Sequence, residues 1–171
     1  MNVPKHVVQA VNEALRLLPP AMGSKEARVM LYAIGLQESR FVHRAQVIAG
    51  GGKGPARGYW QFERGGGVTG VLRHPSSKYW MNSACNARNV PAQPMNVWLA
   101  LETDDVLSAA AARLLLFTDD EIGPWRGAGQ HHHAREIFTE RAKLLNRFIG
   151  GGGGVRGNRV HHRPLNRLNR F

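Results

Sequence analysis

Glu38 occupies a position where the surrounding residues predict the buried face of a helix. Ala27, Leu31 and Ile34 recur at helical spacing. Glu38 continues that stripe about three turns after Ala27, at about 3.6 residues per turn. Burial disfavours the ionised carboxylate and is expected to raise its pKa, which gives a general acid for work near neutral pH. The alternative is a glutamate at a helix end whose carboxylate reaches solvent.

A second group of polar and aromatic residues follows a glycine-rich turn at residues 50–54. The segment behind it, residues 56–63, reads Ala-Arg-Gly-Tyr-Trp-Gln-Phe-Glu. As a strand it would place Tyr59, Gln61 and Glu63 on one face and the intervening aromatic residues on the other. A ring on such a face can stack on a ligand, and a carboxamide can hydrogen-bond to it. Ordinary half-exposed strand residues would show the same spacing.

These motifs together are similar to those of a known family. Glu38 and Ser39 close a helix, and a glycine turn and the Gly-Tyr-Trp-Gln run at 58–61 follow. This order resembles the soluble lytic transglycosylases and goose-type lysozymes, and more narrowly the short lysozyme-like proteins of tailed bacteriophages. Tyr59 stands where the family usually has leucine. A weaker match is Pro-Trp-Arg-Gly at 124–127.

The resemblance covers residues 24–148 and implies both a fold and a reaction. The fold is a lysozyme-like helical domain with a short irregular β-ribbon after the catalytic helix. The reaction is cleavage of the MurNAc–GlcNAc β-1,4 bond of peptidoglycan, with Glu38 as general acid and then as base. In a lytic transglycosylase that base takes a proton from the muramic acid 6-hydroxyl, which closes a 1,6-anhydro ring. Ser39 is then expected to orient Glu38 by a hydrogen bond, and Tyr59 and Gln61 to place the sugar.

Three further residues leave the chemistry open. Between Glu38 and Glu102 the only other acid is Glu63, which could activate water as the second carboxylate of a hydrolytic lysozyme. Trp125 and Arg126 are expected either to anchor a loop on the core or to stack on a sugar and bind substrate carboxylates. A chitinase with the same kind of fold is a further alternative.

Composition indicates one folded domain, because 43% of the 171 residues are hydrophobic. The resemblance implies that residues 1–149 form this domain and that it is a lysozyme-like catalytic domain. The single cysteine, Cys85, allows no intramolecular disulfide and is expected to be a small buried hydrophobe. Three consecutive histidines at 131–133 would point about 100° apart on a helix and so could not converge on one ion. We therefore expect neither a metal nor a cofactor.

Nothing in the sequence predicts a membrane-bound or secreted protein. The first residues lack the charged-then-apolar pattern of a signal peptide, and no run of about 18 apolar residues is present. We expect a monomer made in the cytoplasm. It would reach the cell wall through a holin lesion, on a virion or by external addition.

The net charge of +11 is unevenly distributed. Residues 1–149 carry a net charge of +6, whereas residues 150–171 hold five arginines and no acid. The glycines at 150–154 predict a flexible linker. Residues 155–171 predict a disordered cationic tail that binds an anionic outer membrane or lipopolysaccharide. A nucleic-acid arm and a tail that serves only solubility are the alternatives.

Two readings of the whole chain involve no enzyme. One is a basic nucleic-acid-binding protein, which would bind DNA with strong salt dependence. The other is a structural virion protein with a degenerate lysozyme fold. The body of the chain shows no helix-turn-helix, ribbon or zinc signature, so we expect no specific nucleic-acid partner.

Apolar periodicity and capping residues predict a mainly α fold that positions these side chains. The helix that carries Glu38 is expected to begin after Ser24 and to need Gly35 for a close approach by another element or by substrate. Residues 106–117 are apolar nearly all round and predict a central buried helix. The remaining expectations are a ribbon of 45–49 with 58–62, helix caps at Asn96 and Thr103, and helices over 4–18 and 131–148.

Overall fold

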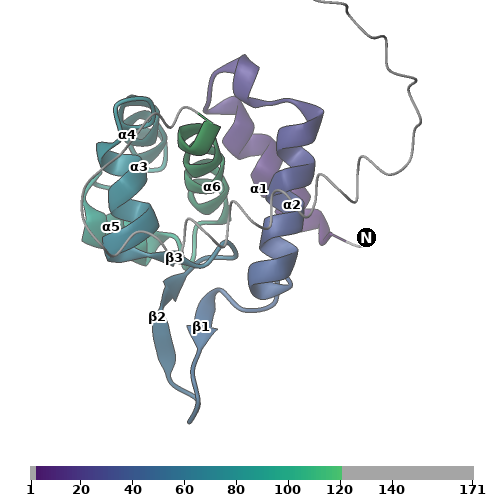
Figure 1. Cartoon of the computed structure of the whole chain (residues 1–171), viewed down its shortest axis with the longest axis vertical. Coiled ribbons are helices and arrows are strands. Elements are labelled where there is room, and N and C mark those ends of the chain that lie inside the picture. Colours follow the sequence, from purple (N-terminus) through teal and green to yellow (C-terminus); the bar gives the residue numbers. More distant parts are fainter. Residues whose placement is uncertain (1–2, 121–171) are drawn as a thin grey trace, which may run out of the picture.

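The computed structural model describes residues 3–120 of the chain (Figure 1). The described part is mainly helical with a small antiparallel sheet, so the mainly α fold class is confirmed there. The helices are α1 (Lys5–Arg16), η1 (Pro20–Met22), α2 (Lys25–Ser39), η2 (Arg64–Val68), α3 (Thr69–Arg73), α4 (Lys78–Ala87), α5 (Pro94–Ala100) and α6 (Asp105–Asp120). The strands are β1 (Ala45–Val47), β2 (Lys53–Arg57) and β3 (Phe62–Glu63).

Helix α6 is the centre of the fold. It contacts α1, α2, α3 and α4, and Figure 1 shows it between the α1–α2 pair and the group formed by α3, α4 and α5. Its small side chains let the neighbouring helices approach closely, and burial of its apolar residues drives the packing. The prediction of a central buried helix is confirmed, because these residues are completely buried: Leu107, Ala109, Ala110, Ala111, Ala112 and Leu114.

Helix α2 begins and ends at well-defined caps. The Ser24 hydroxyl accepts a hydrogen bond from the Ala27 N–H at 3.1 Å, as the sequence predicted. The helix ends at Arg40, which adopts the left-handed conformation. Gly35 is needed because a Cβ there would lie 2.2 Å from the Phe41 ring. The close approach expected at Gly35 is therefore confirmed, and the approaching element is the chain just after the helix.

The sheet differs from the predicted ribbon. Strand β1 pairs with β2 in antiparallel register, and β2 pairs with β3 through Arg57 opposite Phe62. Residues 58–61, expected as a strand, instead form the turn between β2 and β3. Gly58 has φ +73° and Gln61 has φ +50°, values that a strand does not contain. The Gln61 N–H closes the turn by donating to the Gly58 carbonyl at 3.1 Å.

Two predicted caps are wrong and the predicted role of the cysteine is confirmed. Helix α5 begins at Pro94, which suits a first helical position, so Asn96 lies inside the helix. Helix α6 is capped by Asp104 in place of Thr103, since the Asp104 carboxylate accepts from the Leu107 N–H at 2.9 Å. Cys85 is fully buried in α4.

Other predictions fall on parts of the chain that the structure does not describe. The helix over 131–148, the linker at 150–154 and the tail at 155–171 lie outside residues 3–120. Within the described range, no helix has both the length and the apolar character needed to cross a membrane.

Candidate functional site

Glu38 lies in the last turn of α2 and its side chain is partly buried. Two members of the stripe that predicted its position, Leu31 and Ile34, belong to the core, whereas Ala27 is only partly buried. Beyond Glu38 the chain reverses through Arg40 and Phe41 toward the sheet. The expectation of a carboxylate at the end of a core helix, next to the start of a β-ribbon, therefore holds in the geometry.

Ser39 joins the end of α2 to the turn between β2 and β3. Its hydroxyl donates to the Tyr59 carbonyl at 2.8 Å, with the Gly35 carbonyl at 3.1 Å as a second acceptor, and it accepts from the Phe41 N–H at 3.1 Å. The residue is only 5% exposed. The expected roles of Ser39 as a substrate contact and as a hydrogen-bond partner of Glu38 are replaced by a structural one, because its single proton and its burial commit it to the backbone.

The backbone is strained on both sides of this hydrogen bond. The positive-φ residues other than glycine within residues 3–120 are Arg40, Phe41, Gln61 and Asn89. The first two directly follow the end of α2, and Gln61 closes the turn that Ser39 holds. Each such conformation costs about 1–3 kcal/mol, and they cluster at functional sites. Three of these four residues therefore lie at the junction of α2 with residues 58–61.

Tyr59 is buried, and its predicted place on an open sugar-binding face is wrong. The side chain is 2% exposed, because residues 58–61 turn and do not alternate as a strand would. The phenol OH hydrogen-bonds the His6 ring at 3.1 Å, and the Phe41 ring packs edge-on at 5.6 Å between centroids. The Arg44 guanidinium lies 4.6 Å from the Tyr59 ring centroid. Burial raises the pKa of Tyr59, so the phenol stays protonated.

Gln61 is the member of the turn that keeps partial access to solvent. Its side-chain amide donates to the Gly58 carbonyl at 2.8 Å and approaches the His43 carbonyl at 3.4 Å. The N–H side of the carboxamide is thereby fixed to the backbone. A fixed carboxamide suits a role in positioning, and the predicted sugar contact of Gln61 remains a prediction.

Gly58 fixes the same turn against the central helix. A Cβ at this position would lie 2.3 Å from the Ser108 hydroxyl and 2.8 Å from the Leu101 carbonyl, and φ is positive as well. The Gly58 N–H also donates to the Arg44 carbonyl at 2.7 Å. Glycine is therefore required twice, once by conformation and once by contact. The turn is held from α2 by Ser39 and from α6 by this close approach.

Ion pairs account for most acids near the junction. Asp105 accepts two hydrogen bonds from the Arg44 guanidinium, at 3.0 and 2.7 Å, and this pairing raises the pKa of Arg44. Asp104 lies 2.7 Å from Arg88 in addition to capping α6. Glu102 pairs with the cations of β2. These three acids therefore support structure, and the position of Asp104 and Asp105 at a helix start in the sequence predicts this for those two.

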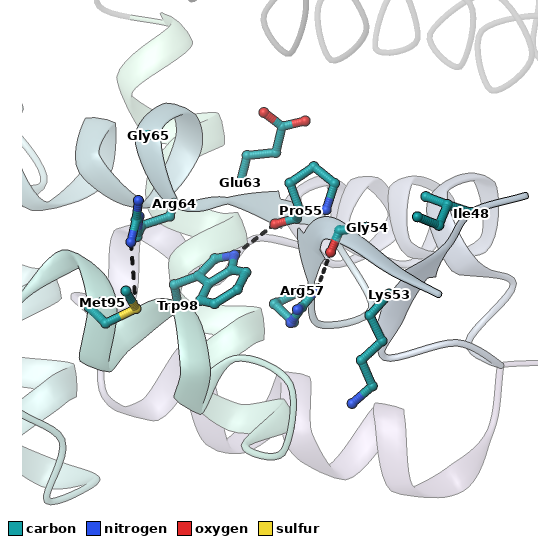
Figure 2. A pocket seen from close by; sticks show the side chains of 10 residues that line it. All are labelled: Ile48, Lys53, Gly54, Pro55, Arg57, Glu63, Arg64, Gly65, Met95 and Trp98. Atoms are coloured by element: carbon teal, nitrogen blue, oxygen red, sulfur yellow. Dashed lines mark hydrogen bonds between the residues drawn. The ribbon is translucent and has the colours of Figure 1, made fainter. Parts of the chain in front are cut away.

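Glu63 is exposed. It borders a hollow of about 660 Å³ formed by β2, β3, η2 and α5 (Figure 2). Glu38 lies at the end of α2, so the structure does not place the two carboxylates in this one hollow. The expected common face for Tyr59, Gln61 and Glu63 is likewise wrong, since Tyr59 is buried and Glu63 is exposed.

Two residues that the sequence patterns did not indicate, Arg57 and Trp98, form one wall of this hollow. Arg57 is 8% exposed, its guanidinium lies 4.3 Å from the Trp98 ring centroid, and its Nε lies 2.9 Å from Glu102. The indole N–H of Trp98 donates to the Pro55 carbonyl at 2.8 Å. The contact joins residues far apart in the chain, so local spacing contained no signal for it.

Comparison of the chain with protein-family models, curated proteins and solved structures found no match. The resemblance to lysozyme-like proteins therefore stays a prediction that rests on the motifs themselves. Trp125 and Arg126 lie outside the described residues, so their expected contacts with sugar are also still predictions. No cluster of three or more metal-ligating side chains occurs in the part of the chain that the structure describes.

Proposed function

We propose that the protein is a peptidoglycan-degrading enzyme that cleaves the MurNAc–GlcNAc bond, with Glu38 as the catalytic acid. The observation that carries the proposal is the 2.8 Å hydrogen bond from Ser39 to the Tyr59 carbonyl. It joins the helix end that bears Glu38 to the Gly-Tyr-Trp-Gln turn, so two motifs that resemble one family on sequence are in contact in space. The strained backbone at Arg40, Phe41 and Gln61 supports the same location.

The proposed reaction uses Glu38 twice. The protonated carboxyl donates to the glycosidic oxygen as the bond to the anomeric carbon breaks, and the substrate N-acetyl group stabilises the cationic centre. The carboxylate then accepts the proton of the muramic acid 6-hydroxyl as that oxygen closes the 1,6-anhydro ring. No water is consumed, and Glu38 regains its proton. Ser39 and Gly58 act as positioning residues, because both hold the turn next to Glu38.

Replacement of Glu38 tests this assignment. Glu38→Gln removes the proton donor with almost no change in volume, so wall clearing should fall on the order of 10³-fold. Glu26→Gln is the matched control, because Glu26 lies in the first turn of the same helix and is exposed. Turbidity loss of peptidoglycan suspensions and circular dichroism melting should be measured for both variants. Full clearing by folded Glu38→Gln would remove Glu38 from the mechanism.

A hydrolytic lysozyme is the second candidate, and the exposed carboxylate of Glu63 is the observation that favours it. Glu63 is exposed in a hollow, and its carboxylate has no hydrogen-bond or ion-pair partner among the residues that the structure describes. A carboxylate that can reach water could act as the base of an inverting hydrolase. Mass spectrometry of the released muropeptides separates the two: anhydro ends support the transglycosylase, and reducing ends that vanish in Glu63→Gln support the lysozyme.

The basic segment at 155–171 is proposed to bind an anionic outer membrane or lipopolysaccharide. Removal of residues 150–171 should lower activity on intact Gram-negative cells and leave activity on purified wall near that of the full chain. An equal loss on both substrates would show that the segment serves the catalytic domain itself.

A further inference from the structure

The hollow beside Glu63 has both charged and apolar walls. Three cations border it, from β2 and the start of η2: Lys53, Arg57 and Arg64. Three large apolar residues border it as well: Ile48, Met95 and Trp98. Ile48 and Met95 are each 45% exposed, so this apolar surface is open to a ligand. Its volume, about 660 Å³, is in the range of sites for small ligands.

One wall of the hollow is held rigid by contacts of its own. The Arg57 guanidinium donates to the Gly54 carbonyl, lies against Glu102 and stacks on Trp98. Trp98 is in turn held by its hydrogen bond to the Pro55 carbonyl (Figure 2). A preformed wall reduces the entropy lost when a ligand is ordered on it.

The cations of the hollow differ in how far they are already neutralised. Lys53 and Arg57 share the carboxylate of Glu102. Arg64 contacts the sulfur of Met95 at 3.7 Å and forms no ion pair within the part of the chain that the structure describes. Figure 2 shows the Glu63 carboxylate directed away from Trp98. Arg64 is therefore the cation that can pair with a carboxylate from outside.

We propose that this hollow binds the peptide stem of peptidoglycan. Arg64 would pair with a stem carboxylate, while Met95, Trp98 and Ile48 would contact the methyl groups of its alanines. The stem fits because it combines free carboxylates with small apolar side chains, which is the complement of these walls. The inference rests on the proposed function, since it names a further part of the same substrate.

Two substitutions test the hollow: Gly65→Leu should fill part of it, and Arg64→Gln should remove one of its cations. Gly65 lines the hollow and a Cβ there meets nothing within 4 Å, so Gly65→Leu places its side chain in open space. Gly70→Leu is the control, because Gly70 is equally open and lies in α3, outside the lining residues. Arg64→Gln removes the charge, and Lys78→Gln does so at an exposed position away from the hollow.

The experiment compares cleavage of two substrates by each variant of the full chain. One substrate is intact peptidoglycan, and the other is the same glycan after an amidase has removed its peptide stems. The wild type should prefer the intact polymer, and Gly65→Leu and Arg64→Gln should each lower that preference about three- to fivefold, the range expected for one partly exposed ion pair. The control variants should keep the wild-type preference.

The outcomes separate the subsite from the proposed function. Cleavage of both substrates with a preference that neither Gly65→Leu nor Arg64→Gln changes would overturn the subsite and leave the enzyme assignment intact. Absence of cleavage of either substrate by the wild type would overturn the proposed function, and the subsite with it. Equal losses in the control variants would also reject the subsite, since the effect would then be one of stability.

Discussion

The two ends of α2 carry glutamates in opposite surroundings. Glu26 lies exposed in the first turn, where a hydrogen bond from its own backbone N–H and the Ser24 side chain lower its pKa. Glu38 lies in the last turn, partly buried beside the junction with residues 58–61. The helix dipole stabilises a carboxylate at the first end and opposes one at the second. The same residue type thus meets opposite fields of the helix dipole at the two ends of one helix.

The largest expected difference in cleavage rate is between Glu38→Asp and Glu26→Asp, which each shorten one side chain by one methylene. Glu38→Asp should draw the carboxyl group back from the scissile bond and lower the rate of wall cleavage about 10²-fold or more. Glu26→Asp should leave the cleavage rate within about twofold of the wild-type rate, because aspartate is also favourable at a helix start. Initial rates on purified peptidoglycan measure both. A rate for Glu38→Asp close to wild type would mean that Glu38 does not take part in proton transfer.

The next largest effect is expected from the turn at residues 58–61, which Ser39 holds against the end of α2. Gly58→Ala forces a Cβ against Ser108 and Leu101 at a positive φ, and should cost about 2–3 kcal/mol of unfolding free energy. Gly70→Ala has open space and an ordinary helical conformation, so it should be neutral or stabilising by up to about 1 kcal/mol. Urea unfolding of both variants tests the pair. Equal stabilities would contradict the close packing of the turn on α6.

Replacing two buried serines distinguishes the effect of a lost hydrogen bond on stability from its effect on activity. Ser39→Ala leaves the Tyr59 carbonyl and the Phe41 N–H without their partner, and Ser77→Ala leaves the Val71 carbonyl without its own. Each should cost about 1–2 kcal/mol of unfolding free energy. Only Ser39→Ala should also lower the cleavage rate per folded molecule, by about tenfold, because only Ser39 holds the Glu38 end of α2. A matching rate loss in Ser77→Ala would show that both effects are general loosening.

The smallest expected effect is on the pH dependence of stability, and it concerns Glu26 in the first turn of α2. The pKa of Glu26 is lowered from its ordinary value of 4.5 by hydrogen bonds from its backbone and from Ser24. A lowered folded pKa contributes stability above the unfolded value, and that contribution disappears as the pH falls through the folded value. Wild type should therefore be slightly more stable than Glu26→Gln well above pH 4.5, and the two should converge in acid. Thermal melts at pH values above and below 4.5 measure the difference in stability between the two proteins. A difference that stays the same at every pH would contradict the prediction.

Local patterns predicted the helices, and the central one in particular. Residues 106–117 are apolar nearly all round, and residues 106–112 of α6 are buried accordingly. Ser24 and Gly35 were also predictable, because a cap and a close approach leave signals within a few residues. Mainly α architecture follows from these patterns alone. A lysozyme-like topology does not, because nothing in them fixes how the helices are arranged in space.

The sheet and the hollow depend on contacts between distant residues, which single-sequence patterns do not contain. Residues 58–62 alternate and include aromatic residues, yet the Ser108 contact and the positive φ of Gly58 make them a turn. Strand β2 contains Gly54 and Pro55, which usually argue against a strand, and it persists because β1 and β3 pair on either side. The stacking of Arg57 on Trp98 joins β2 to α5 and had no local signal.

The buried thiol of Cys85 in α4 can report local unfolding of the protein. Cys85 is the only cysteine in the chain, and desolvation raises its pKa to about 11. Alkylating reagents react with the thiolate, so the native molecule should resist them until α4 separates from its neighbours. The alkylation rate under native conditions therefore reads out local unfolding at one known site, without a probe having to be introduced.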